Sequence, residues 1–275
     1  MIFINGKETD VSQISLERFP PEAYDILHLM AKNNKRYEFQ YLWELEWDLA
    51  IRLHTVLEAT NLYKSAAKFA SFSTSKCNEK YWRLTEKGAF ELKKGVTPQT
   101  GIEDIFINSD KYAFECATAV VIVLYKAVLD TIDTNTFNRN FANLVLYDWQ
   151  YDPDLVLKDS VGTDYLPGDI LYFKNPDYNP ETPEWKGENS ILLEEGLFYG
   201  HGIGIKTEEG MIRVLNRKRK KDAKISAYLT ENIIRVDAYN ISQLRNVNLY
   251  PITKRKYNIF ADIIISKVGS KIYLL

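Results

Sequence analysis

The chain has 275 residues, and its 35 Lys and Arg against 37 Asp and Glu give a formal charge of −2. With 45% hydrophobic and 26% charged residues, it has ample apolar side chains for a core, which excludes an intrinsically disordered protein. The 13 glycines and 9 prolines exclude a collagen-like chain, and the near-neutral charge gives no general electrostatic reason to bind nucleic acid.

The N-terminus has none of the features of a secretory signal. The first 13 residues contain charged side chains and lack a long apolar run, so we expect cytoplasmic synthesis. The strongest apolar run, residues 119–125, is far shorter than the roughly 20 residues that cross a bilayer, so we expect no membrane segment. Two cysteines, Cys77 and Cys116, are too few to stabilise a chain of this length through disulfide bonds, and cytoplasmic synthesis leaves both thiols reduced.

Helical patterns dominate the first half of the chain. Apolar residues recur at helical spacing over 38–63, and two tryptophans add a second apolar stripe, so we expect a helix buried on more than one side. Two short β-type segments flank a glycine turn within 81–93 and predict a hairpin. A short helix is predicted over 98–107 and a long one over 116–132.

After residue 141 the pattern changes to short apolar segments typical of strands. The predicted strands are 143–148, 169–173, 190–193, 197–199, 202–205 and 211–215. Helices followed by a meandering antiparallel sheet indicate an α+β fold. No linker or repeat divides the chain, so we expect one compact domain.

Cys116 stands where the long predicted helix begins. A thiol in the first turn would face unpaired backbone N–H groups and the positive end of the helix dipole, which lower its pKa and favour the nucleophilic thiolate. The alternative is a small apolar residue in a core helix, because buried cysteines are common. Cys77 lies in a polar loop and is expected to be incidental.

A cysteine nucleophile needs an acid–base partner, and two residues in the second half are candidates. His201 lies between two glycines that leave its ring sterically open, on the strand-rich half where cysteine hydrolases carry their histidine. Glu188 precedes the strand at 190–193. The alternatives are a turn histidine and a solvated turn glutamate, and neither residue is specific by itself.

Five motifs in a fixed order are much more specific than any one residue. They are Tyr-Ala-Phe-Glu-Cys-Ala-Thr-Ala (112–119), Tyr-Asp-Trp (147–149), Gly-Asp-Ile-Leu-Tyr-Phe-Lys-Asn-Pro (168–176), Trp-Lys-Gly-Glu-Asn (185–189) and Gly-His-Gly-Ile-Gly (200–204). Together with segments 64–70 and 81–83, they make the chain resemble the small spore-coat transglutaminases of endospore-forming bacteria. The resemblance covers about the first 245 residues.

The resemblance implies a fold, an activity and a site. The family cross-links glutamine and lysine side chains of spore-coat proteins, and its core is similar to the papain-like NlpC/P60 cysteine hydrolases. Cys116 falls at the family's nucleophile, and Glu188 and His201 fall at its partners. Glu115 matches a glutamate expected to substitute in part for the main acidic partner. An enzyme of this kind would be made in the cytoplasm and assembled on the forespore surface.

The resemblance also implies that the active residues lie inside a tunnel. Phe69, Trp149, Trp185 and Asn189 are expected to line it. For each aromatic residue, ordinary packing in the core is the alternative.

The chain departs from the family pattern in two places. Lys186 stands where the family often has Arg, which changes the hydrogen-bonding geometry beside Glu188. The chain also continues beyond the expected catalytic domain, 1–245, into a basic extension, 246–275. We expect this extension to pack on the same domain, with a partner-docking tail as the alternative. The basic run 217–221 is read as a solvated hairpin end rather than a nucleic-acid patch.

The implied reaction can be written on these residues. The Cys116 thiolate attacks the γ-carboxamide of a protein glutamine, ammonia leaves, and a lysine ε-amine opens the thioester to give an isopeptide bond. Glu188 is favoured as the acid–base group, with His201 orienting the site. The reverse assignment stays open, because the sequence gives no distances. The backbone N–H of Cys116 is a candidate oxyanion donor.

The sequence contains no calcium-binding loop and no Cys/His spacing suited to zinc, and His28 and His54 have no clustered metal partners along the chain. We therefore expect no metal or other cofactor and no loss of activity with chelators. Two alternatives stay open. One is a papain-like cysteine amidase or peptidase that uses water as the acceptor, and the other is a non-catalytic coat or scaffold protein.

Overall fold

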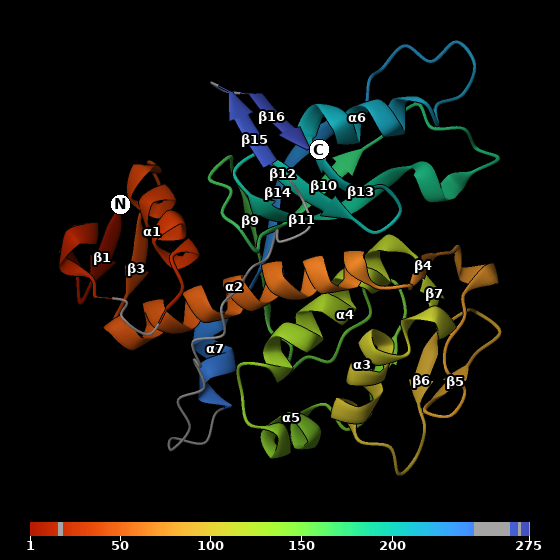
Figure 1. The fold of residues 1–275 in the computed structure, drawn as a ribbon, viewed down its shortest axis with the longest axis horizontal. Helices are drawn as coiled ribbons and strands as arrows, with labels where there is room; N and C mark the ends of the chain where they lie inside the picture. The colour runs from red at the N-terminus through yellow and green to blue at the C-terminus, as the bar shows by residue number, and fades with distance from the viewer. Residues whose placement is uncertain (16–18, 245–264, 269–270, 275) are drawn as a thin grey trace.

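The structure is a computed structural model that describes residues 1–15, 19–244, 265–268 and 271–274. Its centre is a six-stranded antiparallel sheet with helices on both faces (Figure 1). All of these strands come from the second half of the chain. In spatial order they are β13 (Gly204–Thr207), β12 (Leu197–Gly200), β11 (Gly187–Glu194), β10 (Ile170–Lys174), β14 (Tyr228–Val236) and β9 (Leu157–Val161).

Helices that pack against the sheet lie both below it and above it in Figure 1. They are α2 (Leu42–Lys64) and α4 (Cys116–Leu129) below, and α6 (Glu208–Asn216) above. Side chains along β11 alternate between the two layers, as a strand requires. Ile191 belongs to the core that α4 helps to build, whereas Leu192 packs in a second core with Met211 of α6.

Helix α4 lies at the centre of the larger core. Every residue of α4 except Lys126 is buried. Its run of β-branched residues has a low intrinsic helix propensity, so burial against α2 and the sheet stabilises the helix more than local preference does. Because Cys116 is the first residue of this helix, the core fixes the position of the thiol.

Smaller elements surround this centre. Near the N-terminus, a three-stranded sheet and α1 pack against the first turns of α2 around a separate core. These elements are β1 (Ile2–Ile4), β2 (Lys7–Glu8), β3 (Tyr37–Phe39) and α1 (Glu22–Lys32). The remaining short strands are β4 (Lys68–Phe69), β5 (Trp82–Leu84), β6 (Phe90–Leu92), β7 (Ala113–Phe114) and β8 (Val145–Leu146), with β15 (Ile265–Val268) and β16 (Lys271–Leu274) pairing antiparallel. The remaining α-helices are α3 (Pro98–Ile107), α5 (Thr134–Asn140) and α7 (Ala238–Gln243).

A buried ion-pair network joins α2 to the central sheet. The carboxylate of Asp169, which is fully buried, accepts from Arg52 Nη1 at 2.7 Å and from Arg235 Nε at 2.8 Å. The turn before β10 reaches α2 through Gly168, which has φ +85; a Cβ atom there would lie 2.8 Å from the Cα atom of Arg52. This network sets the distance between the helix layer and the sheet.

Most predicted elements are present, and the mixture of helices with antiparallel sheets is confirmed. The prediction of a strand over 211–215 is wrong, because these residues form part of α6, whose N-cap Thr207 accepts a hydrogen bond from the backbone of Gly210. The basic run 217–221 follows this helix and is not the end of a hairpin. Residues 246–264 of the predicted extension lie outside the described residues. No helix in the described part of the chain is long and apolar enough to cross a membrane.

Candidate active site

Cys116 opens α4, and its neighbour Glu115 caps the helix. The Glu115 carboxylate accepts the backbone N–H groups of Ala117 at 2.7 Å and Thr118 at 2.6 Å. It therefore occupies two of the first-turn donors that the thiol was expected to face. The Cys116 side chain is 8% exposed and receives a hydrogen bond from the Asn189 side-chain amide, with Nδ2 and Sγ 3.4 Å apart.

The electrostatic setting of the thiol differs from the expectation. Burial, followed by the negative charges of Glu188 and Glu115, raises the pKa of Cys116 well above its usual value. Hydrogen bonds from the backbone and side chain of Asn189 oppose this rise. The expectation of a lowered pKa is wrong, because a buried thiol beside two carboxyl groups loses more from desolvation and repulsion than it gains at a helix start. In the resting site the thiol keeps its proton.

Glu188 lies on β11 and is 1% exposed. Burial raises its pKa to about 8, and the Glu115 carboxylate adds to the rise, while backbone hydrogen bonds from Gly202 and His201 lower it. The Gly202 N–H group lies 3.3 Å from Oε1 of Glu188. A pKa near 8 suits a group that both accepts and returns a proton near neutral pH.

The space for the Glu188 carboxyl group depends on a glycine on the neighbouring strand. A Cβ atom on Gly200 would lie 2.7 Å from Oε1 of Glu188 and 2.8 Å from its Cγ atom. The first glycine of the Gly-His-Gly-Ile-Gly motif therefore makes room for the carboxyl group. The motif thus serves Glu188 as well as His201.

His201 is held by hydrogen bonds on both ring nitrogens. Nδ1 lies 2.9 Å from the Tyr199 hydroxyl, and Nε2 lies 3.1 Å from the backbone carbonyl oxygen of Lys68. The ring stacks on Phe114, with centroids 4.7 Å apart and planes at 19°. Burial lowers the pKa of His201 to about 4, so the imidazole is neutral at physiological pH.

The thiol opens onto a cavity of about 270 Å³. Besides Cys116 and Glu115, its walls include Phe69, Asn189 and Pro183. Part of the wall is aromatic, and the carboxamide of Asn189 reaches the sulfur. A narrow cavity with a thiol, carboxyl groups and an amide donor suits a carboxamide side chain better than a large ligand.

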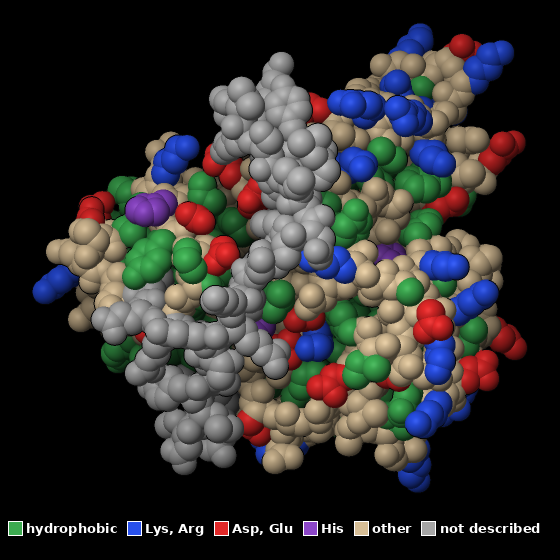
Figure 2. Space-filling model, in the orientation of Figure 1, with side chains coloured by type: hydrophobic (Ala, Val, Ile, Leu, Met, Phe, Trp, Pro, Cys, Tyr) green, Lys and Arg blue, Asp and Glu red, His purple; other side chains and the backbone are tan. Residues whose placement is uncertain are grey.

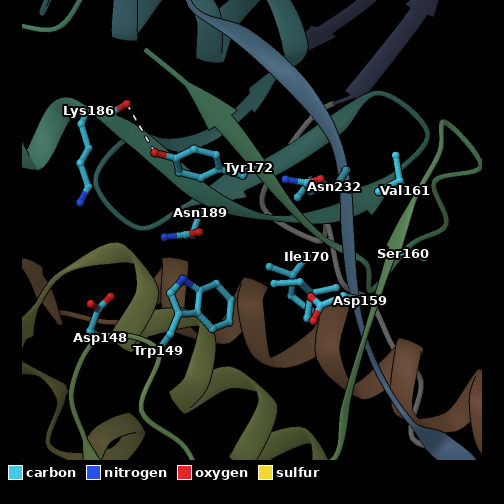
Figure 3. A pocket seen from close by; sticks show the side chains of 12 residues that line it. Asp148, Trp149, Asp159, Ser160, Val161, Ile170, Tyr172, Lys186, Asn189 and Asn232 are labelled. Atoms are coloured by element: carbon cyan, nitrogen blue, oxygen red, sulfur yellow. Dashed lines mark hydrogen bonds between the residues drawn. The ribbon is translucent and has the colours of Figure 1, made fainter. Parts of the chain in front are cut away.

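A second cavity, of about 630 Å³, adjoins the first. Four residues line both of them: Asp148, Tyr172, Lys186 and Asn189. Figure 3 shows this cavity with Asp148 and Trp149 on one side and Tyr172 and Asn189 on the other. The Tyr172 hydroxyl donates to the Lys186 carbonyl oxygen at 3.4 Å, which links two of the shared residues.

The structure distributes the predicted tunnel residues over these two cavities. Phe69 lines the Cys116 cavity, Trp149 lines the larger one, and Asn189 lines both. Trp185, also predicted to line the tunnel, lines neither of these two cavities; its ring packs on Phe69, with centroids 5.6 Å apart. The negative charge of Glu188 acts on the Cys116 thiol, and the ring centroids of His201 and Phe69 lie 6.4 Å apart.

Sequence reasoning missed three residues of the site. Tyr199 fixes the imidazole of His201 through its hydroxyl, and only its position two residues earlier, in the strand that ends just before His201, signalled this. Asp148 has a left-handed backbone conformation, with φ 50, and stands where both cavities meet. Tyr172 lines both cavities, and the period-2 pattern of β10 gave no reason to single it out.

One group of side chains in the described residues has the composition of a metal site. His54 and Glu58 lie one turn apart on α2, and their ligand atoms lie within 4.8 Å of each other and of Asp130. The expectation that His54 has no clustered metal partners is therefore wrong: Glu58 is four residues away on the same helix, and the fold brings Asp130, which follows α4, close to both. However, Lys126 Nζ lies 2.6 Å from Oδ1 of Asp130, so a cation of the protein already balances the carboxylate. The cluster ties α2 to α4 through charge.

Relatives with known names are similar to this chain in sequence. Protein-glutamine gamma-glutamyltransferases from two species of Bacillus match it over most of their length. The Bacillus cereus protein is 44% identical over 253 residues, covering 92% of both chains. The Bacillus anthracis protein is 47% identical over 222 residues, covering 81% of this chain and 80% of its own.

A solved structure is similar to the fold as well. The transglutaminase from Geobacillus stearothermophilus, solved without its C-terminal extension, superposes with a TM-score of 0.71 at 50% sequence identity, and the match covers 74% of this chain and 98% of that one. The family model described as protein-glutamine gamma-glutamyltransferase matches residues 1–245. This chain therefore belongs to the protein-glutamine gamma-glutamyltransferase family.

Proposed function

We propose that the protein joins glutamine and lysine side chains of proteins through ε-(γ-glutamyl)lysine bonds, with Cys116 as the nucleophile. The observation that carries this proposal is the placement of the Cys116 thiol at the junction of a core helix and a small cavity, beside a buried carboxyl group whose pKa is raised to about 8. A thioester formed there stays reactive toward an amine.

In the first step the ionised form of Glu188, which is populated as the pH approaches its pKa of about 8, accepts the thiol proton as Sγ bonds to the γ-carbon of a glutamine. The C–N bond then breaks, and the proton passes from Glu188 to the leaving nitrogen, which departs as ammonia. In the second step a lysine amine loses a proton to Glu188 and attacks the thioester; the sulfur leaves as a thiolate and takes this proton back from Glu188. The backbone N–H of Cys116 stands as the oxyanion donor in both steps.

Glu188 is the better partner for these transfers, and His201 the better positioning residue. The nitrogen atoms of His201 are engaged by Tyr199 and Lys68, and the lowered pKa keeps the ring neutral. Glu115 keeps a secondary acidic role in this scheme, because its charge acts on both Cys116 and Glu188.

The two cavities suit the two substrates. The cavity that contains Cys116 takes the glutamine side chain, and the larger cavity admits the acceptor lysine from the other side of Asn189. Trp149, Ile170 and Ile234 give the larger cavity an apolar wall for the lysine methylenes, and Asp148 offers a negative charge for the ammonium group. Joined end to end, the cavities form the tunnel that limits hydrolysis of the thioester.

The wider context follows from the same resemblance. A helix that presents Cys116 against an antiparallel sheet bearing Glu188 and His201 fits a papain-like core of the NlpC/P60 type. We propose one catalytic domain over 1–245, with the 246–275 extension packed on it. The substrates would be spore-coat proteins, and the protein would act on the forespore surface after cytoplasmic synthesis.

Incubation with a glutamine peptide and a fluorescent primary amine tests the proposed function. Wild-type protein is expected to couple the amine to the peptide and release ammonia, and Cys116→Ala is expected to do neither. Conversion of the glutamine to glutamate without coupling would indicate a cysteine amidase instead. Coupling that survives in Cys116→Ala would overturn the site, and a chelator is expected to leave the rate unchanged.

A further inference from the structure

A strongly basic surface lies on α6 and the loop that follows it. Residues 213–224 contain seven Lys or Arg side chains and one acidic side chain, Asp222. Figure 2 shows Lys and Arg side chains gathered at the upper right, over α6 and this loop. We call the exposed members the basic surface: Arg213, Arg217, Lys218, Lys220, Lys221 and Lys224.

The basic surface has a defined shape. Asp177 accepts the backbone N–H groups of Lys224 at 2.7 Å and Ile225 at 2.8 Å, and its other oxygen lies 3.2 Å from Lys220 Nζ. The backbone N–H of Asn179 donates to the Lys218 carbonyl oxygen at 3.0 Å. One end of each interaction thus belongs to the 175–186 segment, which connects β10 to β11 and holds the loop in place.

Most of these cations have no anionic partner. Among the described residues, the side chains of Arg213, Arg217, Lys221 and Lys224 make no ion pair, whereas Lys220 is paired with Asp177. Several unpaired cationic side chains within a short stretch create a positive electrostatic potential. This potential attracts an acidic partner over a screening length of about 8 Å at physiological ionic strength.

The basic surface reaches the candidate active site through a chain of contacts. Lys218 Nζ lies 4.6 Å from the centre of the Trp185 ring, and Trp185 lies 5.6 Å from Phe69. Phe69 in turn lines the cavity that contains Cys116. When a glutamine of a substrate protein enters this cavity, the substrate residues on either side of that glutamine therefore lie within reach of the basic surface.

We propose that the basic surface docks an acidic segment of the protein that donates the glutamine. This inference rests on the proposed function, and it adds a substrate preference that the active-site residues do not supply. Acidic residues flanking the reactive glutamine would pair with Arg217, Lys221 and their neighbours, and so raise the encounter rate and lower KM. A protein fits better than a nucleic acid, because the surface is continuous with a cavity suited to a carboxamide side chain and the whole chain carries a charge of −2.

Two glutamine peptides that differ only in their flanks test the proposal. One carries aspartates beside the glutamine and the other carries serines, and kcat/KM is measured for each with the same amine. Wild-type protein is expected to prefer the acidic peptide roughly tenfold, and this preference is expected to fall as salt is raised. Arg217→Glu combined with Lys221→Glu is expected to abolish the preference. Lys94→Glu, an exposed lysine after β6, serves as the matched control and is expected to retain it.

Direct binding separates this proposal from the proposed function. The fluorescent acidic peptide is expected to bind wild-type protein and the Lys94→Glu control, but not the Arg217→Glu, Lys221→Glu variant, whether or not amine coupling occurs. Equal binding by all three proteins, or no preference in the wild type, would overturn the docking surface. Duplex DNA that binds through the same two residues, without any preference among peptides, would identify a nucleic-acid surface instead.

Discussion

Nε2 of His201 lies 3.1 Å from the backbone carbonyl oxygen of Lys68. A carbonyl oxygen only accepts, so Nε2 carries a proton, and the neutral ring must accept at Nδ1 from the Tyr199 hydroxyl, 2.9 Å away. Neither nitrogen is left to take a proton from Cys116. The proton transfers of the proposed reaction therefore fall to Glu188, and His201 holds the site in place.

Glu188 gives the first prediction, which concerns stability. Its pKa is about 8 in the folded protein and near its ordinary value in the unfolded chain, so the folded state binds the proton more tightly. Stability is therefore present at low pH and is lost as pH rises from about 4.5 through about 8. Glu188→Gln removes this loss and is expected to gain about 2–4 kcal/mol over wild type between about pH 5 and about pH 9.

Urea unfolding of wild type and Glu188→Gln across this pH range provides the measurement. Because Glu188 is 1% exposed, solvent screening does little to reduce the effect. Parallel pH dependences for the two proteins would show that Glu188 ionises as easily in the folded state as in the unfolded one. In that case its role as the proton acceptor would lose its physical basis.

Glu115 gives a prediction about the reactivity of the thiol. Glu115→Gln keeps an oxygen that can accept from the first turn of α4 but removes a charge that raises the pKa of Cys116. Iodoacetamide is therefore expected to alkylate Cys116 about threefold faster at neutral pH, since the thiolate fraction grows. Mass spectrometry of the peptide containing Cys116 separates this reaction from that of Cys77, whose pKa burial raises to about 11.

Glu115→Asp is the matched control for that experiment, because it retains both the charge and a side chain suited to an N-cap. Its alkylation rate is expected to stay close to that of the wild type. A slower reaction of Glu115→Gln would mean that the helix cap, rather than the charge, governs the thiol.

Asp148 gives a prediction about the acceptor. Asp148→Asn retains a residue that tolerates the left-handed backbone there, with φ 50, and removes the negative charge shared by the two cavities. KM for cadaverine, which is cationic, is expected to rise two- to fivefold, as loss of an exposed charge pair of about 0.5–1 kcal/mol would give. KM for hydroxylamine, which is uncharged at neutral pH, is expected to stay constant. A matching rise for both acceptors would exclude recognition of the ammonium group.

Asp169 gives a prediction about the scaffold. Asp169→Asn leaves Arg52 and Arg235 without their shared buried partner, and removal of one member of a buried ion pair costs about 3–5 kcal/mol. Glu91→Gln, which breaks the exposed pair with Arg83, is expected to cost less than about 1 kcal/mol. Thermal unfolding of the two variants measures the difference, and equal losses would show that the network does not join α2 to the sheet as described.

The parts of the fold that the sequence predicted are those with strong local signals. Helix α3 begins at Pro98 after the N-cap Thr97, and both residues are typical of a helix start, so its bounds agreed with the prediction. Helix α6 was missed because its short apolar segment, 211–215, reads equally well as a strand. The cap at Thr207 was the signal that would have identified it.

The chemical properties of the site were harder to predict from the sequence than the residues that form it. The sequence placed Cys116 at a helix start, but it gave no measure of the burial and the second carboxyl group that raise the thiol pKa. The hydrogen bond from His201 to Lys68 joins residues 133 positions apart, and no local pattern encodes it. Contacts of this kind depend on tertiary packing. For the same reason the sequence left open whether Glu188 or His201 is the acid–base group.

The acyl-enzyme itself is the most direct test of the central claim that Cys116 is the nucleophile. Wild-type protein is mixed with a glutamine peptide in the absence of any amine, quenched in acid, digested and analysed by mass spectrometry. The account predicts that the peptide containing Cys116 gains the mass of the donor less ammonia, that added amine removes this adduct, and that Cys116→Ala forms none. An adduct on any other residue, or cross-linking by Cys116→Ala, would contradict the account.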